Sequence, residues 1–133
     1  MTRETGLFSH QTLGSNDIER SKRFYDALFA AMGGAPGTID AKGRLIYTHD
    51  GGRLIITRPV NGEAASHGNG STLGLAMTSP QQVDAWHAAG VVHGGTSCED
   101  PPGIREATEG RRLYLAYLRD PDGNKLCALH RIS

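Results

Sequence analysis

The stretch that decides the fold is residues 119–130, RDPDGNKLCALH, in which a tight turn precedes an apolar strand. The turn, Asp120-Pro121-Asp122-Gly123-Asn124, consists of residue types that favour a chain reversal. The runs on either side, RLYLAYLRD (112–120) and KLCALHRI (125–132), are β-rich, so the sequence predicts a pair of strands that closes the chain. Cys127 lies in the second strand, where its thiol either takes part in chemistry or fills space.

Outward from this hairpin, strand-like and helix-like periods alternate, which is the pattern of a mixed α+β domain. Helices are predicted from Asp17 to Gly34 and from Ser79 to Gly90. A hairpin turn, Asp50-Gly51-Gly52, separates two further β-rich runs. The other segments are a strand at 8–15, a polar loop at 60–71, a strand at 72–78 and an irregular or weakly extended stretch at 98–110.

Both helices carry recognisable start signals. Asp17 is a good N-cap for the first, and Gly33-Gly34 supplies its end. Ser79 is the N-cap of the second, with Pro80 at the first helical position and Gln82 placed to complete a capping box.

The chain also contains an internal repeat. The two N-caps lie 62 positions apart (79 − 17), which places Phe24 on Trp86 and His10 on Thr72. The two Asp-Gly turns lie 72 positions apart (122 − 50), which places Ile55 on Cys127. We therefore predict one domain, residues 1–133, built from two modules at about 6–60 and 71–133.

Composition limits the classes of partner. Lys plus Arg and Asp plus Glu number 14 each, so the formal charge is zero and nothing favours nucleic acid or an anionic membrane. No apolar run is long enough for a signal peptide or a membrane span. Two cysteines, Cys98 and Cys127, are too few for a disulfide framework. We expect a cytoplasmic protein with reduced thiols and a small-molecule partner.

Two motifs carry a family resemblance. HQTLGSNDIERSKRFYDALFAAMGG (10–34) resembles the opening signature of the vicinal oxygen chelate superfamily, which includes glyoxalases, bleomycin resistance proteins and extradiol dioxygenases, and LAYLRDPDGNKLCAL (115–129) resembles its closing signature. The resemblance implies an α+β fold of two βαβββ modules around an eight-stranded open cup that holds the ligand. A homodimer would be usual for such a protein.

In metal-using members, the first and last strands of each module supply the ligands on the floor of the cup. The resemblance assigns these places to His10, Ile55, Thr72 and Cys127. Ile55 cannot bind a metal and Thr72 is a poor ligand, whereas such sites usually have at least three protein ligands. We therefore expect no metal cofactor; if a divalent ion such as Zn binds, His10 and Cys127 would hold it.

Each candidate residue has two interpretations. His10 is a general base or ligand acceptor, or else a buried, hydrogen-bonded histidine. Cys127 is a nucleophile activated by His10, or a small core residue, with the latter favoured. Tyr117 orients a ligand or packs in the core. Arg105 clamps a carboxylate or phosphate, or is an idle loop residue. The loop histidines His67 and His93 are taken as incidental.

Three functions remain open. The first is an enzyme-like protein, a lyase, isomerase or dioxygenase relative, that acts on a small organic molecule in the cup. In it His10 is the base, Tyr117 and Arg105 orient the ligand, and Ile55 and Thr72 line the site. The second is a metal-independent, non-catalytic protein that sequesters a ligand, as bleomycin resistance proteins do. The third is a structural or regulatory homodimer whose cup is vestigial.

Overall fold

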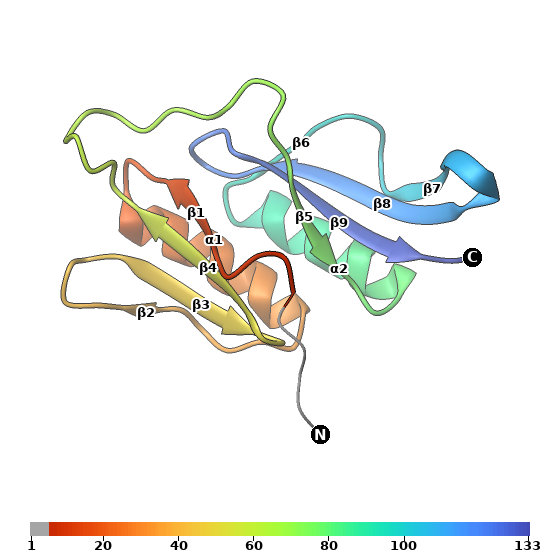
Figure 1. Ribbon diagram of the computed structural model, residues 1–133, viewed down its shortest axis with the longest axis horizontal. Helices are drawn as coiled ribbons and strands as arrows, with labels where there is room; N and C mark the ends of the chain where they lie inside the picture. Colours follow the sequence, from red (N-terminus) through yellow and green to blue (C-terminus); the bar gives the residue numbers. More distant parts are fainter. Residues whose placement is uncertain (1–5) are drawn as a thin grey trace.

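The structure is a computed structural model that describes residues 6–133. Its N-terminal half forms one βαβββ unit (Figure 1), whose elements are β1 (Gln11–Gly14), α1 (Ile18–Ala31), β2 (Thr38–Ile39), β3 (Leu45–His49) and β4 (Gly52–Thr57). The four strands form one sheet in the order β1-β4-β3-β2, with β1 parallel to β4.

The C-terminal half repeats this unit with one additional strand. Its elements are β5 (Leu73–Ala76), α2 (Pro80–Val92), β6 (Thr96–Ser97), β7 (Gly103–Glu106), a 3-10 turn (Thr108–Gly110), β8 (Arg112–Arg119) and β9 (Lys125–Arg131). The second sheet has the order β5-β9-β8-β6, and β7 also pairs with β8. The predicted two-module α+β fold is confirmed, with nine strands among the described residues.

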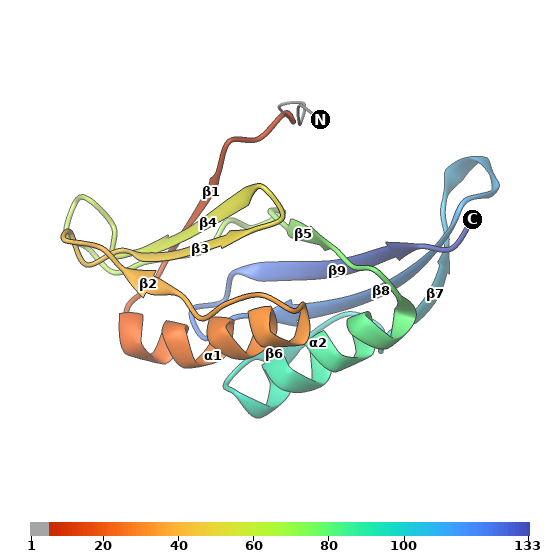
Figure 2. The ribbon, with the colours of Figure 1, turned by 90° about the horizontal axis from the view of Figure 1, so that it is seen from below.

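The register of the two sheets confirms the repeat. Thr12 lies opposite Ile55 in the first sheet, and Gly74 lies opposite Cys127 in the second. These pairs are related by the same offsets, 62 and 72, that the sequence predicts. Both helices lie on the same side of the two sheets, which leaves the other side open (Figure 2). None of the helices in the described part of the chain is long and apolar enough to cross a membrane.

The helix starts follow the predicted caps, with one difference. The Asp17 carboxylate accepts the Arg20 backbone N–H at 3.0 Å, and the Ser79 hydroxyl oxygen accepts the Gln82 backbone N–H at 3.1 Å. The Gln82 amide oxygen accepts the backbone N–H of Thr78 at 2.8 Å. The Gln82 side chain therefore bonds to Thr78, the residue before the N-cap, rather than to the backbone of Ser79.

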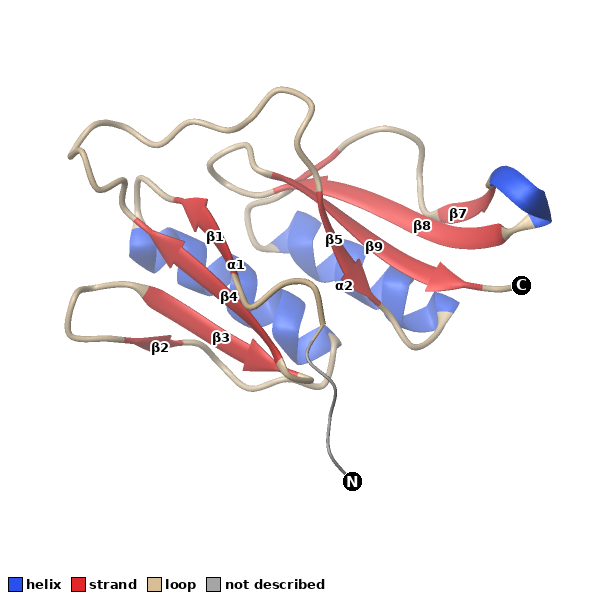
Figure 3. Cartoon of the chain, viewed as in Figure 1, coloured by secondary structure: helices blue, strands red, loops and turns tan. Residues whose placement is uncertain are grey.

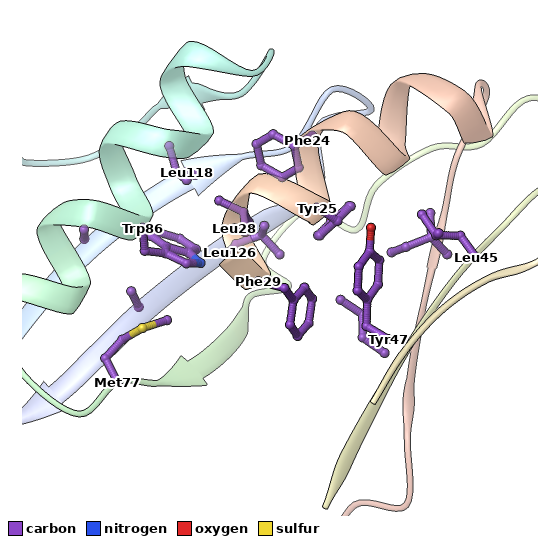
Figure 4. Packing of buried hydrophobic residues seen from close by; sticks show 14 of the residues in the cluster. Phe24, Tyr25, Leu28, Phe29, Leu45, Tyr47, Met77, Trp86, Leu118 and Leu126 are labelled. Carbon is purple, nitrogen blue, oxygen red and sulfur yellow. The ribbon is translucent and has the colours of Figure 1, made fainter. Parts of the chain in front are cut away.

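The core lies between the helices and the sheets. Phe24 and Trp86, which the repeat places on each other, are both fully buried, and Phe24 packs edge-on against Tyr25 (Figure 4). Gly90 in α2 is also buried, and a Cβ there would overlap the Leu118 side chain. A glycine at this position lets α2 approach β8 closely.

The strands differ from the predicted ones in two ways: the first strand is shorter, and two additional short strands are present. The first strand begins at Gln11 rather than residue 8, and Gln11 lies opposite Leu54 of β4. The two-residue strands β2 and β6 are too short for an alternating pattern and escape prediction. Residues 60–71 form a loop between the sheets, as expected (Figure 3).

The DPDGN turn connects the two modules. Asp120 and Asn124 are buried in it, and the Asn124 side-chain amide donates to the Gly14 carbonyl of β1 at 3.0 Å. Asp120 accepts the Tyr25 hydroxyl of α1 at 2.5 Å. Asp122 binds the Arg20 guanidinium at 2.7 Å. The turn of the second module is thus bonded to the first strand and helix of the first module.

Candidate functional site

A cavity of about 790 Å³ lies between the edge strands β1 and β5, and we call it the seam hollow. All residues of both strands line it. Each strand pairs with another on only one side among the described residues, β1 with β4 and β5 with β9. Backbone donors and acceptors on the other side have no strand partner, so they can bond to a ligand.

The floor of the seam hollow is apolar. Phe29 and Met32, near the end of α1, line it together with Leu13, Leu54, Leu73 and Leu75. Phe29 stacks on Tyr47 with ring centres 4.4 Å apart and planes within 3°. Phe8, which precedes β1, is 69% exposed and also lines the cavity. The hollow therefore offers apolar surface to a ligand, although Phe29 and Leu54 are each only 5% exposed.

Its rim is polar and carries more basic than acidic groups. The ionisable side chains on it are those of His10, His49, Asp50, Arg53, His67 and Lys125. The hydroxyls of Ser9, Ser66, Ser71 and Thr72 add neutral donors and acceptors. Apolar walls with a few polar groups are typical of ligand pockets.

Two of the predicted site residues reach this cavity. His10 and Thr72 both line it, from equivalent places before β1 and β5. His10 is exposed, so the interpretation as a buried histidine is wrong; it lies before the strand begins. Its Nδ1 is 2.8 Å from the Ser9 hydroxyl, and its Nε2 has no hydrogen-bond partner in residues 6–133. The ring is oriented by a neighbour, with one nitrogen available to a ligand.

Three others lie together on the second sheet, away from the cavity wall. Tyr117 and Cys127 are directly opposite each other on β8 and β9. The Lys125 ammonium lies 5.0 Å from the centre of the Tyr117 ring and forms an ion pair with Glu99. Arg105 is also close enough to influence Tyr117. Of these residues, Lys125 also lines the seam hollow.

The Cys127 thiol is held in its protonated form. Burial raises its pKa, and the Glu99 carboxylate raises the pKa further. The Tyr117 hydroxyl and the Lys125 charge lower the pKa without reversing the shift. His10, the base that the sequence suggests, is not among the groups acting on the thiol. Both the nucleophile and the thiolate ligand interpretations are weakened, because each needs the deprotonated form.

Burial also raises the pKa of Tyr117, and the neighbouring Cys127 and Glu99 add to the shift, so its hydroxyl is a hydrogen-bond donor at neutral pH. Arg105 donates from Nη2 to the Pro101 carbonyl at 2.7 Å and from Nη1 to its neighbour's carbonyl at 3.4 Å. Its guanidinium is therefore already bonded to its own loop.

The comparisons with known proteins decide the family. No protein-family model matches the chain, and no curated protein matches it. Among solved structures, a glyoxalase/bleomycin resistance protein from Albidiferax ferrireducens T118 is 57% identical, with a TM-score of 0.90, over 95% of this chain and 100% of that one. The chain belongs to the glyoxalase/bleomycin resistance protein family. This membership agrees with the two sequence signatures.

More distant members show the same fold. A glyoxalase-related enzyme from Fulvimarina pelagi has 23% identity and a TM-score of 0.67, over 93% of this chain and 88% of that one. A glyoxalase/bleomycin resistance protein/dioxygenase family enzyme from Burkholderia phytofirmans PsJN has 15% identity and a TM-score of 0.69, over 93% and 98% of the two chains.

The side chains present do not fit the metal site that this family resemblance implies. Ile55 is half-buried beside Thr12 and supplies no donor atom. His10 and Thr72 line the seam hollow, whereas Ile55 and Cys127 do not. Residues 6–133 contain no group of three or more His, Cys, Asp or Glu side chains placed to hold a metal ion.

Sequence reasoning missed several residues of the seam hollow. His67, taken as incidental, lines the cavity and packs against Gly123, where a Cβ would lie 2.5 Å from its Nδ1. Arg53 and Lys125 are 72 positions apart and both line the cavity. The two Asp-Gly turns are also 72 positions apart, so this offset could have identified Arg53 and Lys125 as a pair from the sequence.

Proposed function

We propose that this family member binds a small organic molecule in the seam hollow and needs no metal ion to do so. The observation that carries the proposal is the cavity itself, about 790 Å³ with an apolar floor and a polar rim. This size and this mixture of surfaces suit a ligand of drug-like dimensions. The donor set supports metal independence, because Ile55 and the protonated Cys127 occupy two of the four family positions.

Gly74 offers a direct test of the location. It lines the hollow on the same face as Cys127, its opposite neighbour, and a Cβ built there meets nothing within 4 Å. A side chain at this position therefore begins in open space, and the Gly74→Leu substitution would fill part of the cavity. The control is Ala88→Leu, which introduces the same leucine side chain on the exposed side of α2.

The probe is N-phenyl-1-naphthylamine, an uncharged dye that fluoresces in apolar pockets. We expect saturable binding to the wild type and to Ala88→Leu, unchanged by EDTA, and binding at least about tenfold weaker in Gly74→Leu, since a leucine would occupy apolar surface otherwise given to the ligand. Thermal melts check that all three proteins fold. Absence of saturable binding, equal binding by Gly74→Leu, or loss with EDTA would overturn the proposal.

A catalytic function is a second candidate, and one observation favours it. His10 lies on the rim with Nδ1 bonded to Ser9 and Nε2 open, which is the arrangement of a positioned base. In this reading, His10 removes a proton from a bound ligand. Turnover of a small oxygenated substrate that His10→Gln abolishes, with binding retained, would establish it; binding without chemical change over a substrate panel would remove it.

A further inference from the structure

The loop between the two sheets contains the same dipeptide twice. Residues 60–71 read VNGEAASHGNGS, and two asparagines, Asn61 and Asn69, are each followed directly by a glycine. Both asparagine side chains are exposed to water. An asparagine in this position can cyclise, because glycine has no side chain to keep its backbone nitrogen away from the neighbouring carboxamide. The contacts of each asparagine then determine which of the two reacts.

Asn61 is held in place by its neighbours. Its carboxamide oxygen accepts the Glu63 backbone N–H at 3.0 Å, and its Nδ2 donates to the Glu63 carboxylate at 3.1 Å. The Gly62 N–H, which would have to lose its proton, donates to the Pro59 carbonyl at 3.1 Å. A negatively charged carboxylate so close also opposes the loss of that proton. Cyclisation at Asn61 therefore requires three hydrogen bonds to break first.

Asn69 has none of these restraints. Within residues 6–133, neither its side chain nor the Gly70 N–H makes a hydrogen bond. The Ser71 N–H donates to the Gly68 carbonyl at 3.3 Å, which leaves Asn69 and Gly70 at the tip of the turn. Gly70 has a φ of +99°, and a Cβ built there meets nothing within 4 Å. The attacking nitrogen and the carboxamide are thus both free to approach each other.

We propose that Asn69 is a site of spontaneous modification, which converts it to isoaspartate and aspartate while Asn61 persists. The Gly70 backbone nitrogen attacks Cγ of Asn69, and the new N–C bond closes a succinimide ring. The C–N bond of the carboxamide breaks, and its nitrogen leaves as ammonia with the proton from Gly70. Water then opens the ring at one carbonyl or the other, giving aspartate or isoaspartate. One water is consumed, one ammonia is released, and nothing is oxidised or reduced.

The modification changes the charge of the loop beside the seam hollow. Gly68 and Ser71, which flank the reacting pair, both line this cavity. Either product carries a carboxylate where the chain had a neutral amide, so the formal charge of the protein falls from zero to minus one. The modified protein can therefore be separated from the original by anion exchange.

The experiment follows both asparagines in the same purified protein over time at mildly alkaline pH. Cleavage after Glu63 places Asn61 and Asn69 on different peptides, so mass spectrometry measures each conversion separately. An isoaspartate methyltransferase assay identifies the isoaspartate product. Gly70→Ala introduces a side chain next to Asn69, and Gly62→Ala makes the matched change at the other dipeptide, where φ is also positive.

We expect Asn69 to convert about tenfold or more faster than Asn61 in the folded protein, because only Asn61 must break hydrogen bonds before it cyclises. Gly70→Ala should slow the appearance of the acidic form, and Gly62→Ala should leave it unchanged. In concentrated urea the two rates should become similar, since the restraints on Asn61 are lost. No conversion at Asn69, equal rates in the folded protein, or a difference that persists in urea would overturn the proposal.

Discussion

Replacing Asp120 with alanine should cost much of the protein's stability, since this buried carboxylate joins the two modules. It is 4% exposed and accepts four hydrogen bonds: from the Tyr25 hydroxyl at 2.5 Å, and at 2.9 Å from the Asp122 backbone, the Asn124 backbone and the Asn124 side chain. Alanine would leave the fully buried Tyr25 hydroxyl without its acceptor. Breaking a buried charged network by removing one member costs about 3–5 kcal/mol, so we expect a loss in that range.

The assay is urea denaturation followed by the fluorescence of Trp86, the single tryptophan, which is fully buried. Tyr25→Phe should cost less, about 1–3 kcal/mol, because Asp120 keeps three donors. The double variant should cost less than the sum of the two single ones, since they remove the same bond. Asp84→Ala is the control, because it removes an aspartate–tyrosine bond of 2.9 Å to Tyr114 at an exposed site. A loss below about 1 kcal/mol in Asp120→Ala, or additivity with Tyr25→Phe, would refute the reasoning.

Two further predictions follow from shifted pKa values. Burial raises the pKa of Cys127, so iodoacetamide should alkylate this thiol slowly near pH 7 in a Cys98→Ser variant, and the rate should rise only at pH values above the ordinary pKa range of thiols. Mass spectrometry follows the labelling, and rapid labelling at neutral pH would contradict the prediction. Burial raises the pKa of Asp26, but bonds from Lys22, Tyr47 and the Gly37 N–H lower it more, so the net pKa is below its ordinary value. The stabilisation from this lowered pKa is present above about pH 4 and is lost as the pH falls further. The stability advantage of the wild type over Asp26→Asn should therefore shrink between pH 5 and pH 3 in urea titrations, and a constant difference would argue against it.

The sequence predicted most of the fold because its signals are local. Asp17 and Ser79 mark the helix starts through side-chain bonds that span three residues. The repeat offsets of 62 and 72 positions also relate the strand pair Thr12–Ile55 to the strand pair Gly74–Cys127, since equal units form equal sheets. The strands β2 and β6 have two residues each, which is too short for any periodic pattern.

The site was less predictable because it forms where the two modules meet. The family signatures grouped His10 and Thr72 with Ile55 and Cys127, and of these four residues only the first two line the seam hollow. Which of the family positions reach the cavity depends on how the edge strands β1 and β5 lie relative to each other. No single segment of the sequence encodes this arrangement. His67 reaches the rim from a polar loop without periodicity, where its packing against Gly123 is invisible in the sequence.

The repeat also shows how two copies of one unit came to differ in chemistry. At the equivalent places on β4 and β9, the first module has Arg53 and Ile55 where the second has Lys125 and Cys127. The second module binds its own cation with Glu99, whereas Arg53 has no such partner in residues 6–133. The two sides of the seam therefore differ in charge pairing as well as in donor atoms: the Lys125 cation of the second module is bound within its own sheet, and burial keeps the nearby Cys127 thiol protonated.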